Sequence, residues 1–200
     1  MSKADLVADL KASLHDAADI FTAANDADFE RHIDVAALAM GSKRPRTLLG
    51  SVTLSADVMT YLAPDDIVAP KFPIWGVNER NRYRQYERGY PGQLPRLSLV
   101  GGELHLTPAP TAAQIAALGA TYKFYYYAAH QVAADAAQTT IRAGDRGLLL
   151  LRAQAEAMRE LAVRNSGKPV AMRDGMSGQP RNATPAALYR ELLDEFEAAS

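Results

Sequence analysis

The 200-residue sequence contains no cysteine, which excludes disulfide bonds, thiolate metal sites and cysteine nucleophiles. A large net charge is also absent, because 22 Lys and Arg residues nearly balance 23 Asp and Glu residues and leave a formal charge of −1. The chain as a whole is therefore not attracted to nucleic acid or to anionic membranes. Any electrostatic function must be local.

Long apolar runs are missing as well. None approaches the roughly 20 residues that span a membrane, and the first residues lead into an amphipathic helix pattern instead of the apolar core of a signal peptide. With 48% hydrophobic residues, the chain can still bury a sizeable interior. We expect one core, a protein made and kept in a cytosol, and no membrane partner.

Motifs for catalysis and cofactor binding are not found either. The stretch from Asn165 to Pro169 has some likeness to a phosphate-binding loop, but Ala162 stands where the first glycine belongs and Pro169 replaces the magnesium-binding Ser or Thr. The four histidines lie far apart without metal-ligand spacing, and no G-x-S-x-G nucleophile motif is present. We expect no cofactor, no metal site and no catalytic residue, so an enzyme is not predicted.

Apolar residues at helical spacing occupy both ends of the chain. They predict helices over about 3–22, 27–42 and 145–165, and a last helix that opens at Thr184-Pro185. Ser2 with Asp5 forms a capping pattern before the first helix, and the second must end before Pro45. Asp145 is the expected cap of the third.

Four successive leucines, Leu148 to Leu151, begin the helix predicted over 145–165. Because helical residues follow one another at about 100°, these leucines point in every direction around the axis. The start of this helix must therefore be covered on all sides, either by its own chain or by a neighbouring copy.

Between the second and third helices the apolar period changes to two, which is typical of strands. Alternating residues over 46–62 predict a first hairpin. Two further runs flank Gly101-Gly102 and predict a tight second hairpin, since a Gly pair supplies the positive φ angles of a two-residue turn. A short helical turn over 111–118 and a strand over 121–127 follow. The fold class is therefore α+β, a helical bundle core with an inserted antiparallel β-hairpin region and a C-terminal arm.

The predicted organisation has two parts. Residues 1–165 form a helical domain with the β insertion at about 46–127, and residues 166–200 form an arm. Glycine, proline and small polar residues over 166–183 indicate a flexible strap. The amphipathic helix at its end would dock on a partner through Leu188, Tyr189, Leu192 and Phe196.

One local feature stands out within 76–96, which we expect to be a long loop. Residues 79–90 interleave four arginines with three tyrosines. Arg and Tyr are enriched among the residues that contribute most of the binding energy at protein interfaces. They also contact phosphates and stack on nucleic-acid bases. The candidate partner-binding residues are Arg80, Arg82, Tyr83, Arg84, Tyr86 and Arg88. An ordinary solvated loop is the alternative interpretation.

Taken in order, these features resemble the head-to-tail connector, or adaptor, proteins of tailed bacteriophages. The resemblance covers about 2–165 and rests on the following segments: Lys43 to Leu48, which is Arg-Pro-Arg-like, the turn from Tyr61 to Asp66, the hairpin from Gly101 to Pro110, the aromatic strand from Tyr122 to Tyr127, and the helix from Asp145 to Arg164.

The resemblance implies a structural virion protein without catalysis. Such a protein forms a ring, a dodecamer in this family, that binds beneath the portal and extends the DNA channel to join capsid and tail. Its implied partners are the portal protein, neighbouring copies of itself and tail or neck proteins. Genomic DNA would pass without sequence-specific binding. The expected location is the virion neck, and the host cytoplasm during assembly.

Two other function classes stay open from the sequence. A nucleic-acid-binding regulator could use the Arg/Tyr-rich residues 79–90, and its binding would weaken steeply with salt. A small α+β enzyme would need a deep pocket lined by titratable groups with strongly shifted pKa values.

Overall fold

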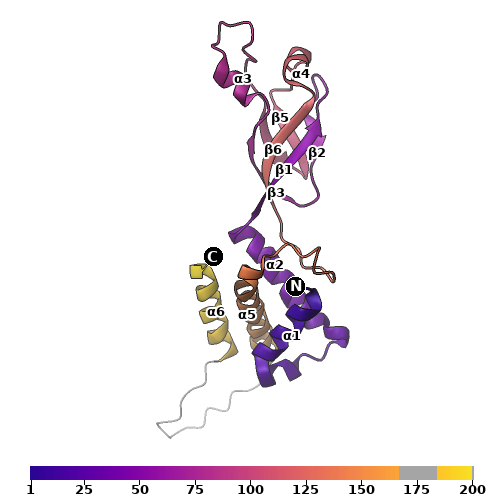
Figure 1. Ribbon diagram of the computed structural model, residues 1–200. Coiled ribbons are helices and arrows are strands. Elements are labelled where there is room, and N and C mark those ends of the chain that lie inside the picture. Colours follow the sequence, from indigo (N-terminus) through magenta and orange to yellow (C-terminus); the bar gives the residue numbers. More distant parts are fainter. Residues whose placement is uncertain (167–183, 200) are drawn as a thin grey trace, which may run out of the picture. The chain divides into compact units, whose positions relative to one another are not determined.

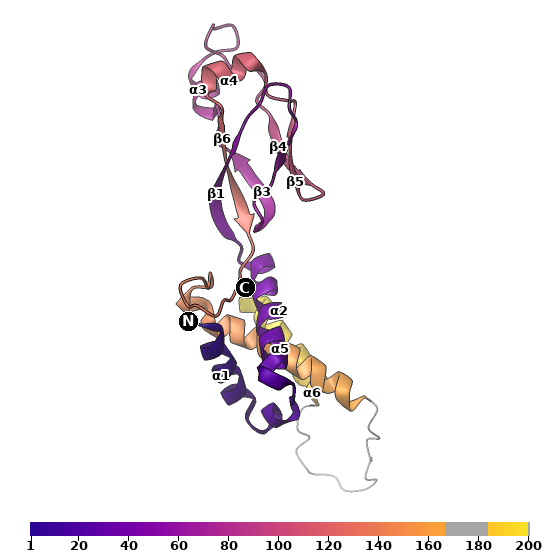
Figure 2. The same ribbon diagram turned by 90° about the vertical axis from the view of Figure 1, so that its right-hand side faces the viewer.

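The computed structural model describes residues 1–166 and 184–199, which form a mixed α+β fold (Figures 1 and 2). The chain divides into two compact units. Unit 1 contains residues 1–44 together with the chain from 130 onward, and unit 2 contains 45–129. Each unit has its own cluster of buried apolar side chains. The strap expected over 166–183 lies, from 167 on, outside the described residues.

Unit 1 is built from helices that bury their apolar stripes against one another. The described α-helices are α1 (Lys3–Leu14), α2 (Ala27–Lys43), α5 (Arg146–Asn165) and α6 (Pro185–Ala199), with short 3-10 turns at His15–Ile20, Ala24–Asp26 and Ala143–Asp145. Fully buried members of the core include Leu6, Leu10, Ile33, Met40 and Leu149. The predicted helices over 27–42 and 145–165 and the helix opening at Thr184-Pro185 are confirmed within a residue or two.

The first helix is shorter than predicted. It begins at Ser2 and Asp5 with the expected capping box, but it ends at Leu14 and not near residue 22. His15 adopts a positive φ of 49°, which interrupts the α-helical ladder, and a 3-10 segment follows. The turn lets Phe21 pack edge-on against Phe29, with ring centroids 5.4 Å apart. This tertiary contact outweighs the helical pattern.

Asp145 does not cap its helix with its side chain. Its carboxylate instead accepts a hydrogen bond from Arg44 at 3.0 Å. Asp145 is thus the N-cap residue, as predicted, but its side chain makes no capping hydrogen bond. The Asp145 side chain forms an ion pair with Arg44, which is distant in the sequence, instead of a hydrogen bond with the helix terminus.

Unit 2 consists of two three-stranded antiparallel sheets. Sheet A has the order β1-β6-β3 and sheet B the order β2-β5-β4. The strands are β1 (Arg46–Thr53), β2 (Thr60–Leu62), β3 (Ile67–Pro73), β4 (Arg96–Val100), β5 (Glu103–Thr107) and β6 (Thr121–Ala128), and two short helices, α3 (Val77–Arg82) and α4 (Ala112–Leu118), complete the unit. Leu104, Leu106, Tyr122 and Phe124 are fully buried in its core.

The hairpin predicted around Gly101-Gly102 is confirmed, and so is the strand predicted over 121–127, which is β6. Val100 pairs with Glu103 across Gly101 and Gly102, whose φ angles are +60° and +85°. The short helix over 111–118 is confirmed as α4, which begins at a capping box between Thr111 and Gln114.

The first hairpin prediction is wrong. β1 pairs along its whole length with β6, and β2 pairs with β5 in the other sheet. An alternating pattern indicates which side chains face inward, but it does not determine which strand is the pairing partner. The strand β3 was not predicted, because Pro70 and Pro73 mask its pattern. Residues 76–96 are likewise not all loop, since α3 lies within them.

Candidate partner-binding surfaces

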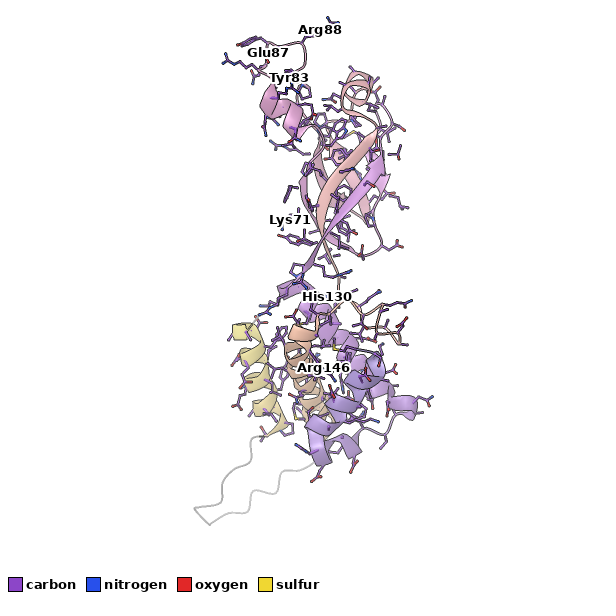
Figure 3. All side chains as sticks on the ribbon, viewed as in Figure 1. Lys71, Tyr83, Glu87, Arg88, His130 and Arg146 are labelled. Carbon is purple, nitrogen blue, oxygen red and sulfur yellow. The ribbon has the colours of Figure 1, made fainter. Side chains whose placement is uncertain are left out.

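The Arg/Tyr tip, residues 77–96, is a folded part of unit 2. The Glu87 carboxylate accepts a hydrogen bond from the backbone N–H of Arg84 at 2.9 Å, and the Arg84 guanidinium donates to the Tyr86 hydroxyl at 2.9 Å. The ring of Tyr83 lies against Gly89. Figure 3 shows Tyr83, Glu87 and Arg88 together at the end of unit 2 that carries α3. These local contacts hold the tip in a defined turn.

The base of the tip is fixed by α4 and sheet A. The Gln114 amide donates hydrogen bonds to the carbonyl oxygens of Pro91 at 2.9 Å and Gln93 at 3.0 Å. The Tyr122 hydroxyl, in the core of the unit, donates to the carbonyl of Pro95 at 3.3 Å. Burial raises the pKa of this hydroxyl, so it stays a protonated donor. The base of the tip is therefore positioned by polar contacts, of which the Tyr122–Pro95 hydrogen bond is buried.

The arginines of the tip are exposed and unpaired. The segment holds five arginines and two glutamates, a local charge of +3. Within the described chain, Arg80, Arg82, Arg88 and Arg96 form no ion pair, whereas Arg31, Arg44, Arg146, Arg152, Arg159 and Arg164 of unit 1 are all paired with carboxylates. Tyr86 is 77% exposed, and Tyr83 is half-buried. The structure thus brings together the predicted residues of this site on the surface.

The predicted docking face of α6 is covered by its own chain. Phe196 is only 1% exposed and belongs to the core of unit 1, and Leu188, Tyr189 and Leu192 pack against that core. The Arg152 guanidinium lies 5.9 Å from the centre of the Phe196 ring. In this structure, the apolar face of the helix is therefore packed within unit 1, and its acidic face is exposed.

A surface that the sequence analysis did not single out lies on the outer face of sheet A. The register aligns Leu49 of β1, Tyr125 of β6 and Phe72 of β3 across the three strands. Leu49 is 53% and Phe72 is 47% exposed, and the Phe72 and Tyr125 rings lie 4.9 Å apart. We call these three residues with Tyr127 the outer face.

Lys71 borders the outer face (Figure 3). Its ammonium lies 4.9 Å from the centre of the Tyr127 ring and donates a hydrogen bond to the Thr47 hydroxyl at 3.3 Å. The alternating pattern of 46–53 with the tyrosines of 125–127 contained this signal. The apolar residues are seen to be contiguous only once it is known that β1 and β3 both pair with β6.

The most strongly perturbed carboxylate belongs to a structural ion-pair cluster in unit 1. Burial raises the pKa of Glu160, but hydrogen bonds from His32, Arg164 and Arg31 outweigh this effect and lower the pKa to about 2. The His32 Nε2 lies 2.8 Å from the Glu160 carboxylate. The acidic and basic side chains of this cluster pair with one another, so the cluster ties α2 to α5.

Within residues 1–166 and 184–199, no group of three or more His, Asp or Glu side chains is arranged to hold a metal ion. No described helix has the length and apolar character needed to cross a membrane.

Comparison of the sequence with models of known protein families and with curated protein sequences finds no match.

Proposed function

We propose that this protein is a head-to-tail adaptor of a tailed bacteriophage, copies of which form a ring beneath the portal and extend the DNA channel toward the tail. The observation that supports this proposal best is the outer face of sheet A. Leu49, Phe72, Tyr125 and Tyr127 form a contiguous apolar surface that a single copy leaves partly exposed.

Contiguous exposed apolar side chains mark interaction sites, whereas isolated ones are common on any surface. Burying the exposed half of a Leu or Phe side chain stabilises an interface by about 1–2 kcal/mol. Because copies in a ring present the same surfaces to one another, a modest gain at each interface is repeated around the ring. We propose that a neighbouring copy covers the outer face.

The start of α5 supports the same proposal. Leu149 is completely buried, but Leu148, Leu150 and Leu151 are only partly covered within unit 1. The expectation that these leucines are covered on all sides is therefore met only in part by a single chain. In the proposed ring, a neighbouring copy supplies the remaining cover.

The portal-binding role of α6 stays part of the proposal in a changed form. Since Phe196 is packed against its own core, the face of Leu188, Tyr189, Leu192 and Phe196 can grip the portal or a neighbour only if α6 leaves that position. Exchange of an identical helix between copies conserves these contacts and is a low-cost route to assembly. We propose such an exchange when the ring meets the portal.

The deciding experiment is the mass of the protein alone and mixed with the portal protein of the same phage, measured by native mass spectrometry. We expect a large closed oligomer in at least one sample. The variant Leu49→Lys with Phe72→Lys should fold but lose this oligomer, because charge then occupies the outer face. Val100→Lys is the matched control, since Val100 is an exposed apolar residue of sheet B. Monomers in both wild-type samples would contradict the proposal.

A second candidate function is that of a nucleic-acid-binding regulator, and the unpaired arginines of the Arg/Tyr tip favour it. Affinity for a random duplex, measured at several salt concentrations, separates the two. A regulator should show a steep loss of affinity with salt, with a slope that reflects several released counterions. An adaptor should bind little, because a channel that held DNA tightly would slow its passage.

A further inference from the structure

A cleft of about 720 Å³ lies at the base of the Arg/Tyr tip in unit 2. Its lining combines apolar groups with two guanidinium groups. Pro73, Val77, Leu94 and Leu97 supply the apolar surface, and Arg80 and Arg96 supply the charge. The volume is within the range of about 300–1,000 Å³ that is common for ligand pockets.

The two arginines of the cleft are available to a ligand. Arg80 and Arg96 are both exposed, and neither is paired with a carboxylate in the described part of the chain. Arginine binds carboxylates through parallel hydrogen bonds from its planar fork of donors. A ligand that carries both carboxylates and apolar groups therefore matches the lining better than a ligand that carries only one of the two.

One wall of the cleft is the edge of a sheet. β4 pairs only with β5, on one side, and the neighbouring strand β3 belongs to the other sheet. Val100 and Glu103 flank the two-residue turn and form a hydrogen-bonded pair. From there, hydrogen-bonded and non-hydrogen-bonded pairs alternate along the two strands, so that Leu97 and Leu106 form a non-hydrogen-bonded pair. The backbone N–H and C=O of Leu97 consequently point away from β5. Pro73, at the end of β3, has no N–H to offer them.

We propose that this cleft binds a short, extended acidic segment of a partner protein. The segment lies in the cleft and pairs with the backbone N–H and C=O of Leu97. Its carboxylates meet Arg80 and Arg96, and its apolar side chains contact Leu94 and Leu97. Addition of a strand to a sheet edge supplies main-chain hydrogen bonds, and side-chain pockets supply the specificity. The inference holds for any function of the chain, so it does not depend on the proposed ring.

An acidic peptide fits the observations better than a nucleic acid does. The floor of the cleft is aliphatic, and the residues that line it include no aromatic side chain on which a base could stack. Tyr86, the most exposed tyrosine of the tip, is not among the lining residues. A phosphate backbone would use the arginines but leave the apolar surface uncovered.

The test measures fluorescence polarisation of a labelled peptide of alternating glutamate and valine, titrated with the full chain. The control peptide alternates glutamine and valine. We expect binding of the acidic peptide only, and a loss of at least about tenfold in affinity for Arg80→Gln with Arg96→Gln, because each substitution removes a charged hydrogen bond. The matched control is Arg82→Gln with Arg88→Gln, which removes the same charge outside the cleft and should change affinity by less than about threefold.

Three outcomes would overturn the inference. The first is the absence of binding by the acidic peptide. The second is an equal loss for both double variants, which would mean diffuse attraction to the whole tip. The third is equally tight binding of a single-stranded oligothymidylate that is lost with the same substitutions, which would identify a phosphate site. Since all four arginines are exposed, the variants should fold, and circular dichroism checks this.

Discussion

Single residues in unit 1 show how a partly buried charge is used for stability. Glu160 of α5 receives hydrogen bonds from His32 and Arg31 of α2 and from Arg164 of its own helix. These donors favour the ionised carboxyl and hold its pKa near 2, against burial that acts in the opposite direction. A carboxyl with a pKa below its ordinary value of 4.5 stabilises the folded state wherever it is ionised.

The first prediction concerns Glu160→Gln. At pH 7 the substitution should lower the free energy of unfolding by about 1–2 kcal/mol, since it removes charged hydrogen bonds at a partly exposed site. The Glu160 contribution is fully present above the unfolded-state pKa of about 4.5 and is lost as pH falls toward 2. Urea unfolding between pH 7 and pH 2.5 should therefore show the difference shrinking with acidification. A constant difference would contradict the assigned pKa.

At the scale of elements, α6 is an integral part of the helical unit. The sequence correctly indicates where this helix begins, and the Thr184 hydroxyl accepts a hydrogen bond from the N–H of Ala187 at 3.3 Å. The same apolar stripe fits two roles, docking on a partner and packing within the chain. Periodicity does not distinguish them, because both require one apolar face.

The second prediction concerns Phe196→Ala. Removing a completely buried ring should lower the free energy of unfolding by about 3–5 kcal/mol. Glu195→Ala, on the exposed side of the same helix, should change it by less than about 0.5 kcal/mol. Thermal unfolding followed by circular dichroism measures both. A small effect of Phe196→Ala would mean that α6 does not remain against α5 in solution.

In the β-strands, the sequence pattern predicts which residues face inward but not which strands pair. The burial pattern of β1 alternates as expected, so its inward residues are predictable. Its partner is β6, whose paired residues are 68 to 82 positions away, and not the next strand. Strand pairing is decided by which surfaces complete the core of unit 2, and this information is spread over the whole insertion.

At the scale of the whole molecule, the chain is organised as two units with separate apolar clusters. Gly50 shows how closely unit 2 is packed. A Cβ atom at this position would lie 2.8 Å from the Phe124 ring, which is completely buried. Separate cores imply that damage to one unit should leave the other folded.

The third prediction is that Gly50→Ala destabilises unit 2 by about 1–3 kcal/mol through overpacking. Hydrogen exchange followed by mass spectrometry should show faster exchange in β1 and β6, with α2 and α5 unchanged. Gly147→Ala is the control, because a Cβ atom there meets no neighbour within 4 Å. Equal acceleration of exchange in both units would show that they unfold as one.

The sequence by itself determined the α+β class, most helix boundaries, the Gly101-Gly102 hairpin and the exposure of the Arg/Tyr residues, because each depends on local periodicity, capping or turn geometry. Only the tertiary structure decided where α1 ends, that β1 pairs with β6, that Phe196 lies in the core, and that Leu49, Phe72 and Tyr125 meet on one face. These features depend on contacts between residues far apart in the chain, and a local pattern does not specify its distant partner.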